Sequence, residues 1–154
     1  MDLQNFKASL PTTEGRVPAN TSAAVNARIE SDTLKRLDAI GTDPEKIEVR
    51  LQEIEQEWDI ERILEANAAA ATLVGVSLGA TVSKRWLLLP ALVAGFLFQH
   101  AVQGWCPPLP ILRRLGFRTA REIENERTIL KSRRGDLKNL EISFSGASMR
   151  AVEV

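Results

Sequence analysis

Cysteine and histidine are scarce in this chain of 154 residues, which contains one of each. A single cysteine excludes a disulfide framework and a zinc site built from several thiolates. A single histidine excludes a multi-histidine metal centre within one chain. Glycine-rich phosphate loops, nucleophile elbows and paired metal-ligand motifs are also missing. We therefore predict a protein that is not an enzyme and that holds no metal and no other cofactor.

Charged residues are almost absent from the middle of the chain. Lys plus Arg and Asp plus Glu number 20 each, yet between residues 66 and 112 only Lys84 and Arg85 are charged. Residues 1–65 carry 8 basic and 14 acidic side chains, net −6, and residues 106–154 carry 10 basic and 6 acidic ones, net +4. Because the chain is not net basic and has no series of base-stacking aromatics, we do not expect it to bind nucleic acid.

The uncharged centre consists of two apolar runs, Ala66–Ser83 and Trp86–Trp105. As helices they would extend about 27 and 30 Å at ~1.5 Å per residue, and the hydrocarbon core of a bilayer is ~30 Å thick. Trp86 and Trp105 stand at the ends of the second run, where aromatic belts occur. The alternative is a pair of buried helices in a soluble bundle. Such helices normally keep a polar stripe, whereas neither run has a charged residue on any face, so we favour a transmembrane helical hairpin.

Basic residues flanking the hairpin predict its orientation. Arg62 and four arginines after the second run lie on one side, and only Lys84 and Arg85 lie on the other. The positive-inside rule therefore places both termini in the cytoplasm. No signal peptide is visible near Met1, so we expect the hairpin itself to direct insertion. The four arginines, which we also expect to contact lipid headgroups, are Arg113, Arg114, Arg118 and Arg121.

We predict an all-α protein with five consecutive regions. They are a disordered N-terminus (1–20), a cytoplasmic helical arm (21–65), the transmembrane hairpin (66–83 and 86–105), an interfacial Pro-rich turn with a basic amphipathic helix (106–135), and a disordered tail (136–154). In the last helix, Thr119 and Glu122 form a capping-box pattern at the start and Gly135 marks the end.

The arm is predicted to be an amphipathic αα-hairpin. Asn20 or Thr21 can cap a first helix that ends near Ile40, and Gly41 is a fitting C-terminal stop. Asp43-Pro44 starts a second helix. Nothing between Pro44 and Ser83 demands a break, so this helix is expected to continue into the first membrane segment.

An apolar stripe on the second arm helix is a candidate docking surface. Ile47, Leu51, Ile54 and Trp58 recur at intervals of four, three and four residues, the spacing of a coiled-coil seam. The positions between them are mostly Glu, Gln and Arg. We expect this seam to bind a cytoplasmic protein partner.

Small residues follow one another at four-residue intervals in both apolar runs. Gly75 and Gly79 form a small-xxx-small motif in the first run, and Ala91 and Gly95 share this spacing in the second. Helices in lipid associate by close backbone contact, since lipid supplies little hydrophobic drive. The stripe is therefore predicted to pack the hairpin, a homo-oligomer, or both. Chance is the alternative, because Ala and Gly are common in membrane helices.

Polar residues gather at the end of the second run. Gln99, Gln103 and Cys106 share one helical face, and His100 lies about 100° away from Gln99. They form either a small polar site or a set of interhelical and headgroup hydrogen bonds. Cys106 is either a reactive, persulfide-carrying thiol or a small apolar residue that ends the helix.

Three ordered motifs resemble the YgaP-like inner-membrane transmembrane domain family. They are Leu73-Val74-Gly75-Val76-Ser77-Leu78-Gly79-Ala80-Thr81-Val82, then Trp86-Leu87-Leu88-Leu89, then Gly104-Trp105-Cys106-Pro107. The resemblance covers about residues 66–120. It implies a bacterial inner-membrane hairpin with cytoplasmic termini that forms a homodimer and is linked to a rhodanese sulfurtransferase. No rhodanese domain precedes this hairpin, so a partner would have to supply sulfur transfer.

These observations lead to one functional prediction with two alternatives. We expect a non-enzymatic membrane module that oligomerises in the bilayer and docks a cytoplasmic partner, with a sulfurtransferase suspected. The first alternative is a sulfur-handling or small-anion transport element that uses Cys106. The second is an accessory subunit of a larger membrane complex.

Overall fold

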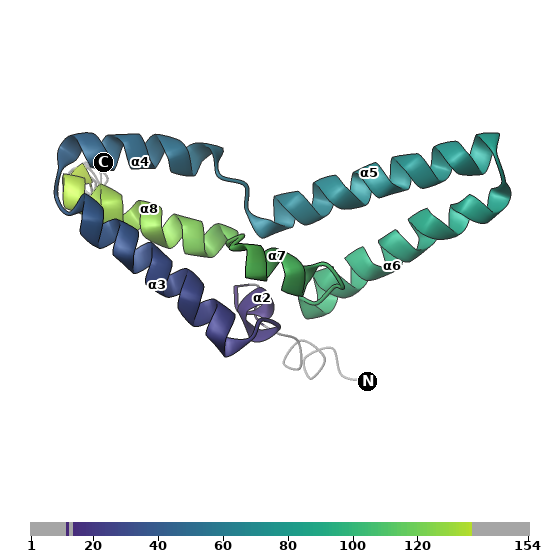
Figure 1. Ribbon diagram of the computed structural model, residues 1–154, viewed down its shortest axis with the longest axis horizontal. Helices are drawn as coiled ribbons and strands as arrows, with labels where there is room; N and C mark the ends of the chain where they lie inside the picture. Colours follow the sequence, from purple (N-terminus) through teal and green to yellow (C-terminus); the bar gives the residue numbers. More distant parts are fainter. Residues whose placement is uncertain (1–11, 13, 137–154) are drawn as a thin grey trace, which may run out of the picture. The chain divides into compact units, whose positions relative to one another are not determined.

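The computed structural model describes residues 12 and 14–136, and these form helices with no strand among them (Figure 1). The predicted all-α class is therefore confirmed. The elements are α2 (Arg16–Ala19), α3 (Ala23–Ile40), α4 (Pro44–Gln56), α5 (Ile60–Thr81), the 3₁₀ helix η1 (Lys84–Leu87), α6 (Leu88–Gln103), α7 (Leu109–Leu115) and α8 (Ala120–Arg134). Most of the predicted N-terminal region and nearly all of the predicted tail lie outside the described residues.

The chain divides into two compact units, and their boundaries differ from the predicted regions. The first unit comprises Met1–Ile29 and Trp58–Ala120, and the second comprises Glu30–Glu57 and Arg121–Val154. The predicted arm is thus divided between the units. The helix predicted to lie at the membrane interface, α8, belongs with α4 rather than with the apolar helices.

In the second unit, one apolar core joins three helices. Leu37 from α3, Ile47 from α4 and Leu130 from α8 belong to a single buried cluster, and the exposed fraction of each is 2% or less. Leu51, Ile54 and Ile123 complete it. The predicted docking seam is therefore wrong for Ile47, Leu51 and Ile54, because the chain's own α3 and α8 already cover this face.

The remaining residue of the seam, Trp58, is 45% exposed and belongs to the first unit. Its ring lies 4.2 Å from the Arg62 guanidinium, a cation–π contact. The predicted start of α4 at Asp43-Pro44 is confirmed, and the Asp43 side chain caps it by accepting hydrogen bonds from the backbone amides of Glu45 and Lys46.

A buried ion-pair network fixes α8 against α4 in the second unit. Glu126 is fully buried, and its carboxylate accepts hydrogen bonds from Arg50 Nε at 2.9 Å and Arg50 Nη2 at 3.2 Å. Arg36 approaches the same carboxylate at 3.6 Å. Burial by itself would lower the pKa of Arg50, but hydrogen bonds to Glu126 and Glu53 outweigh it and raise that pKa. The planar guanidinium suits this bidentate contact.

The predicted continuous rod from the arm into the first apolar helix is wrong. Helix α4 ends at Gln56, and α5 starts at Ile60 with the Asp59 side chain accepting from the Arg62 amide at 2.7 Å. In the first unit, the Ile60 amide donates to the Arg118 carbonyl at 2.9 Å. Asp59 is a preferred N-cap residue, and it starts a new helix where the sequence also allowed continuation.

In the first unit, α5 and α6 lie side by side and are joined by η1 (Figure 1). Gly75 on α5 is buried, and a Cβ added there would lie 2.5 Å from Pro90 Cδ. A Cβ added at Gly79 would lie 2.6 Å from Leu87 Cδ2. Only glycine permits this approach, so this part of the small-residue stripe packs α5 against η1 and α6.

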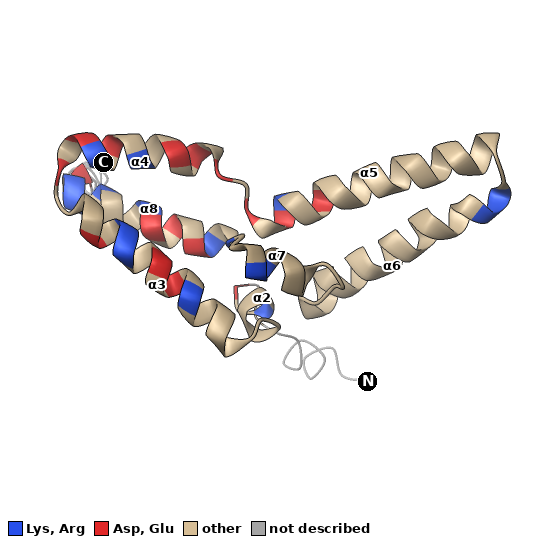
Figure 2. Ribbon diagram, in the orientation of Figure 1, with Lys and Arg blue, Asp and Glu red and all other residues tan. Residues whose placement is uncertain are grey.

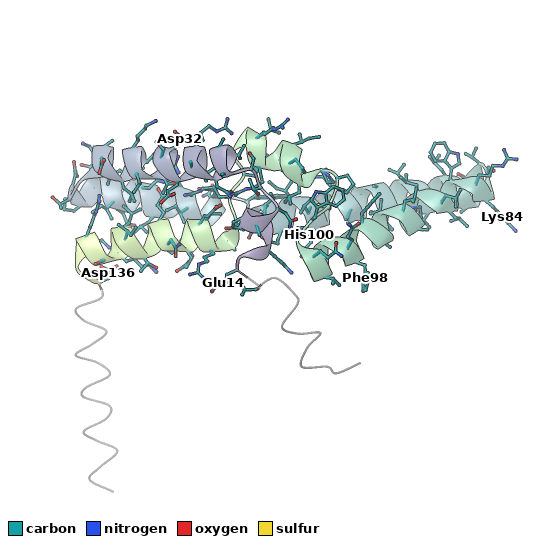
Figure 3. All side chains as sticks on the ribbon, turned by 90° about the horizontal axis from the view of Figure 1, so that it is seen from below. Glu14, Asp32, Lys84, Phe98, His100 and Asp136 are labelled. Carbon is teal, nitrogen blue, oxygen red and sulfur yellow. The ribbon has the colours of Figure 1, made fainter. Side chains whose placement is uncertain are left out.

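Apart from this contact, the two apolar helices leave most of their surface uncovered. Two segments of the described chain each contain an 18-residue window with mean hydropathy 1.4, long and apolar enough to cross a membrane. They are Pro44–Thr81, which includes α5, and Lys84–Gln103, which includes α6. Only 11% and 6% of these windows are buried. Figure 2 shows that charge on α6 and η1 is confined to the turn, and Figure 3 shows Phe98 pointing away from the helices.

Candidate functional site

A cavity of about 380 Å³ lies within the first unit, where α5, α6 and α7 meet. Most of its wall is apolar, which is typical of pockets that bind small molecules. Its volume also falls within the range of such pockets. The lining residues are Leu64, Asn67, Ala68, Ala71, Val93, Phe96, Leu97, His100, Cys106, Pro108 and Leu112.

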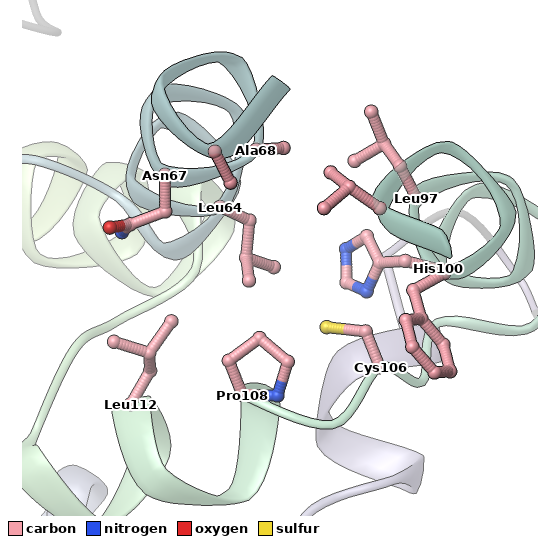
Figure 4. A pocket seen from close by; sticks show the side chains of 11 residues that line it. Leu64, Asn67, Ala68, Leu97, His100, Cys106, Pro108 and Leu112 are labelled. Atoms are coloured by element: carbon pink, nitrogen blue, oxygen red, sulfur yellow. The ribbon is translucent and has the colours of Figure 1, made fainter. Parts of the chain in front are cut away.

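His100 is the most unusual polar group in this wall. Its side chain is only 5% exposed, and neither ring nitrogen has a hydrogen-bond partner. The ring extends from the last turns of α6 into the cavity (Figure 4). An imidazole offers donor and acceptor capacity, and burying such a group without a partner is costly. A ligand or water in the cavity would remove this cost.

Cys106 faces His100 across part of the same cavity (Figure 4). Helix α6 ends at Gln103 because Gly104 adopts a left-handed conformation with φ of 77°, which glycine accepts without strain. The chain then turns and carries the Cys106 sulfur toward the His100 side. The predicted shared face of Gln99, Gln103 and Cys106 is therefore wrong, because helical spacing does not continue past Gly104.

The Cys106 thiol is a poor candidate for a reactive group. It is 4% exposed and packs with Ile60, Leu64 and Leu109 in the core of the first unit. Burial raises the pKa of the Cys106 thiol, and the opposite effect of the Leu109 amide is smaller. A raised pKa leaves less thiolate at neutral pH, and the thiolate is the reactive form.

Gln99 and Gln103 lie outside the cavity wall. Their side chains are joined to each other by a hydrogen bond of 3.5 Å, from Gln99 Nε2 to Gln103 Oε1. The predicted polar cluster is therefore split. His100 and Cys106 are brought together at the cavity, whereas the two glutamines pair on the helix surface.

Helix α2 closes the C-terminal end of α6, within a region predicted to be disordered. Arg16 Nη1 donates to the Ala101 carbonyl at 3.1 Å, and Asn20 Nδ2 donates to the Gln103 carbonyl at 2.9 Å. These carbonyls have no partner inside α6, and a cation at this end also favours the helix dipole. Gly104 fits beneath α2 because it lacks a Cβ, which would lie 2.5 Å from Arg16 Cβ.

The prediction that Asn20 or Thr21 caps α3 is wrong, because both side chains bond to other backbone carbonyls. Asn20 bonds to the Arg16 and Gln103 carbonyls, and Thr21 Oγ1 donates to the Val17 carbonyl at 2.8 Å. Neither side chain caps α3, which starts at Ala23. The predicted ends of this helix at Ile40 and of α8 at Arg134 are confirmed, each followed by a glycine.

Two of the four arginines predicted to contact headgroups have buried side chains. Arg113 is fully buried, and it donates to the Asn26 side chain at 2.9 Å and to the Phe117 carbonyl at 3.0 Å. Arg118 is 3% exposed. The headgroup prediction is therefore wrong for Arg113 and Arg118, while Arg114 and Arg121 are exposed and stay candidates.

The second half of the small-residue stripe takes no part in the contact between α5 and α6. Ala91 is exposed, and nothing lies within 4 Å of a Cβ added at Gly95. This face of α6 is open in the single chain. Comparisons of the chain with protein-family models, with curated proteins and with solved structures found no match, so the resemblance to the YgaP-like family stays a prediction.

Sequence reasoning missed the residues that hold the site in place. Arg16 and Asn20 lie in a glycine- and proline-containing stretch predicted to be disordered, and Asn26 lies in the predicted first helix of the arm. Their partners are backbone carbonyls of α6 and the Arg113 side chain, up to 87 residues away in the sequence. The one local signal was the apolar Val17, which is 1% exposed.

Proposed function

We propose that the chain is a bacterial inner-membrane protein in which α5 and α6 cross the bilayer as a hairpin. The observation that carries the proposal is the uncovered apolar surface of these helices. Leu73, Leu88 and Phe98 are 69%, 67% and 72% exposed, respectively. A continuous apolar surface of this kind in water is an aggregation hazard, whereas lipid covers it without cost.

The alternative of two buried helices in a soluble bundle requires a cover that this chain does not supply. In a soluble bundle the apolar side chains of these helices would be largely buried. Here, 11% and 6% of the two most apolar windows are buried. The second unit shows what burial looks like in the same chain, since its core residues Leu37 and Leu130 are 2% exposed or less.

The proposed role is a non-enzymatic module that assembles with copies of itself through the open face of α6. Ala91 and Gly95 lie on this face, and small residues allow two helices to approach closely in lipid. Both termini are proposed to be cytoplasmic, since Arg62, Arg114 and Arg121 outnumber the two basic residues of the turn even without the buried arginines.

A sulfur-handling role for Cys106 and a small-anion pathway are both disfavoured by the site. The thiol is buried with a raised pKa, which suits packing better than nucleophilic attack. The cavity beside it is lined mainly by apolar side chains, which would not compensate an anion for its lost hydration. The accessory-subunit alternative stays a prediction.

The topology test uses the fact that the chain has one cysteine. In a Cys106→Ser background, Ser83→Cys places a thiol at the turn and Ser132→Cys places one on α8. We expect a membrane-impermeant maleimide added to spheroplasts to label Ser83→Cys at once, and Ser132→Cys only after permeabilisation. Equal labelling of both variants before permeabilisation would contradict the proposed hairpin.

The assembly test compares two leucine substitutions by crosslinking in membranes. We expect Gly95→Leu to reduce the crosslinked dimer, because it fills the open face of α6. Ala80→Leu, on the exposed side of α5, is the matched control and should leave the dimer unchanged. A dimer fraction that is insensitive to Gly95→Leu would mean that this face is not the interface.

A further inference from the structure

We propose that the cavity between α5, α6 and α7 binds a small uncharged amphiphile through a hydrogen bond to His100. The proposed ligand has an apolar body of one or two rings and a single hydroxyl or carbonyl head group. Neither the membrane module described above nor its self-association requires such a site. Entry of the ligand from the lipid rests on the proposed membrane location, but the binding site itself does not.

The wall of the cavity determines the apolar part of this ligand. Leu64, Ala68 and Ala71 from α5 face Val93, Phe96 and Leu97 from α6. A cavity of 150 Å³ with such a lining holds benzene, so about 380 Å³ gives room for a larger ring system. Charged side chains are absent from this wall, and a charged ligand would lose its hydration without compensation.

His100 determines the polar part of the ligand. His100 is only 5% exposed, and neither of its ring nitrogens has a hydrogen-bond partner. A neutral imidazole has one donor and one acceptor, so it can pair with a hydroxyl or with a carbonyl. Figure 4 shows the ring directed into the cavity beside the Cys106 sulfur.

A metal site is the less favourable use of these two side chains. His100 and Cys106 supply two donors, and a structural zinc ion takes four. Among the described residues, no group of three or more His, Cys, Asp or Glu side chains could hold a metal ion. The cavity is also much larger than a single ion requires.

The elements around His100 hold it in this orientation. Helix α2 bonds to the last carbonyls of α6 through Arg16 and Asn20, and α7 packs Leu109 and Leu112 beside Cys106. The cavity is therefore built from packed helices rather than from a loose terminus. A preformed pocket of this kind binds a ligand with less loss of conformational freedom.

The experiment uses 2-naphthol as the probe and naphthalene as its matched control without the hydroxyl. Because the chain has one histidine, a tag-free protein labelled with ¹⁵N-histidine gives imidazole signals that belong to His100 alone. We expect 2-naphthol to shift both ring nitrogen signals in a saturable way, with one probe per chain. Naphthalene should bind about tenfold more weakly, as expected for one lost hydrogen bond.

Three variants separate specific binding from partition into detergent or lipid, with binding followed by the fluorescence of the probes. Ala68→Phe fills the cavity and should abolish saturable binding, whereas Ala70→Phe, on an exposed position outside the lining, should not. His100→Leu should retain naphthalene binding and reduce 2-naphthol to the same affinity. Helical circular dichroism and a monodisperse elution profile check that each variant folds.

Three outcomes would overturn the proposal. They are unchanged imidazole signals at saturating 2-naphthol, equal affinities for 2-naphthol and naphthalene in the native chain, and binding that survives Ala68→Phe. If the protein proved to be monomeric in buffer without detergent, the membrane proposal would fail. The same titration could then be run in buffer, so the two failures are distinguishable.

Discussion

Apolar side chains are buried in the second unit but exposed on the α5–α6 pair. In the second unit, leucine and isoleucine are buried between α3, α4 and α8, and among its described charged residues only Glu126 is buried, where Arg36 and Arg50 pair with it. On α5 and α6, leucine, valine and phenylalanine are exposed, and the buried residues include a glycine and a histidine. One chain thus contains a core suited to water and a surface suited to lipid.

The solvent around a helix therefore determines which of its side chains must be buried. In water, stability comes from removing apolar area from the solvent, so helices need a large apolar contact. In lipid that drive is absent, and close backbone approach at small residues such as Gly75 provides the attraction. A substitution should therefore have very different effects in the two regions.

The largest effect is expected from removing the buried carboxylate of the second unit. Glu126→Ala removes the buried carboxylate that Arg50 and Arg36 share, and because Arg50 keeps Glu53 and Glu57 as partners we expect a loss toward the lower end of the about 3–5 kcal/mol typical of a broken buried pair. Urea unfolding followed by helical circular dichroism measures the loss. Glu55→Ala, at an exposed position of α4, is the control and should change the unfolding free energy very little.

A pair of leucine truncations gives the next largest difference. Leu130 is fully buried, and Leu130→Ala should cost about 2–5 kcal/mol in unfolding free energy. Leu92 is 60% exposed on α6, and Leu92→Ala should cost less than about 1 kcal/mol in lipid, where acyl chains fill the space. If both truncations lowered the unfolding free energy equally, the proposed difference between a water-adapted core and a lipid-facing surface would be wrong.

Two glycines on the apolar helices should respond oppositely to the same change. Gly75→Ala places a methyl group 2.5 Å from Pro90 Cδ, and such overpacking costs about 1–3 kcal/mol. Gly95→Ala meets nothing within 4 Å in the single chain, so at concentrations where the protein is monomeric it should be neutral or stabilise α6 by up to about 1 kcal/mol. Thermal unfolding in a mild detergent compares them, and a Gly75→Ala variant as stable as Gly95→Ala would argue against this close helix contact.

The smallest expected effect concerns the pH dependence of the Cys106 thiol. Because burial raises its pKa in the folded state, the folded chain holds this proton more tightly than the unfolded chain. The resulting stability is complete below the ordinary thiol pKa and is lost as the pH rises through the raised pKa. Unfolding free energies measured between pH 7 and pH 10 should therefore fall more in the native chain than in Cys106→Ser.

The sequence was sufficient to predict most of the helices. Local signals predicted the start of α4 at Asp43-Pro44, the ends of α3 and α8 at glycines, and the two apolar runs. These signals act within a few residues, so they can be read from the chain alone. The seam of Ile47, Leu51 and Ile54 was also recognised, but its partners on α3 and α8 could not be inferred.

The candidate site was less predictable because its geometry depends on contacts distant in the sequence. The sequence singles out both His100 and Cys106, but helical spacing predicts that they lie on different faces. The left-handed conformation of Gly104 ends the helix and brings them together. The role of α2 depends on the carbonyls of Ala101 and Gln103, which any sequence would supply. Arg113 was expected to face lipid because its charge was visible, while its bond to Asn26 was not.

Membrane fractionation tests whether lipid surrounds α5 and α6. Cells producing the full chain would be broken, and the membranes washed with alkaline carbonate before sedimentation. We expect the protein to stay in the membrane pellet and to be released only by detergent. A chain that appears in the supernatant and stays monomeric in buffer without any amphiphile would contradict it.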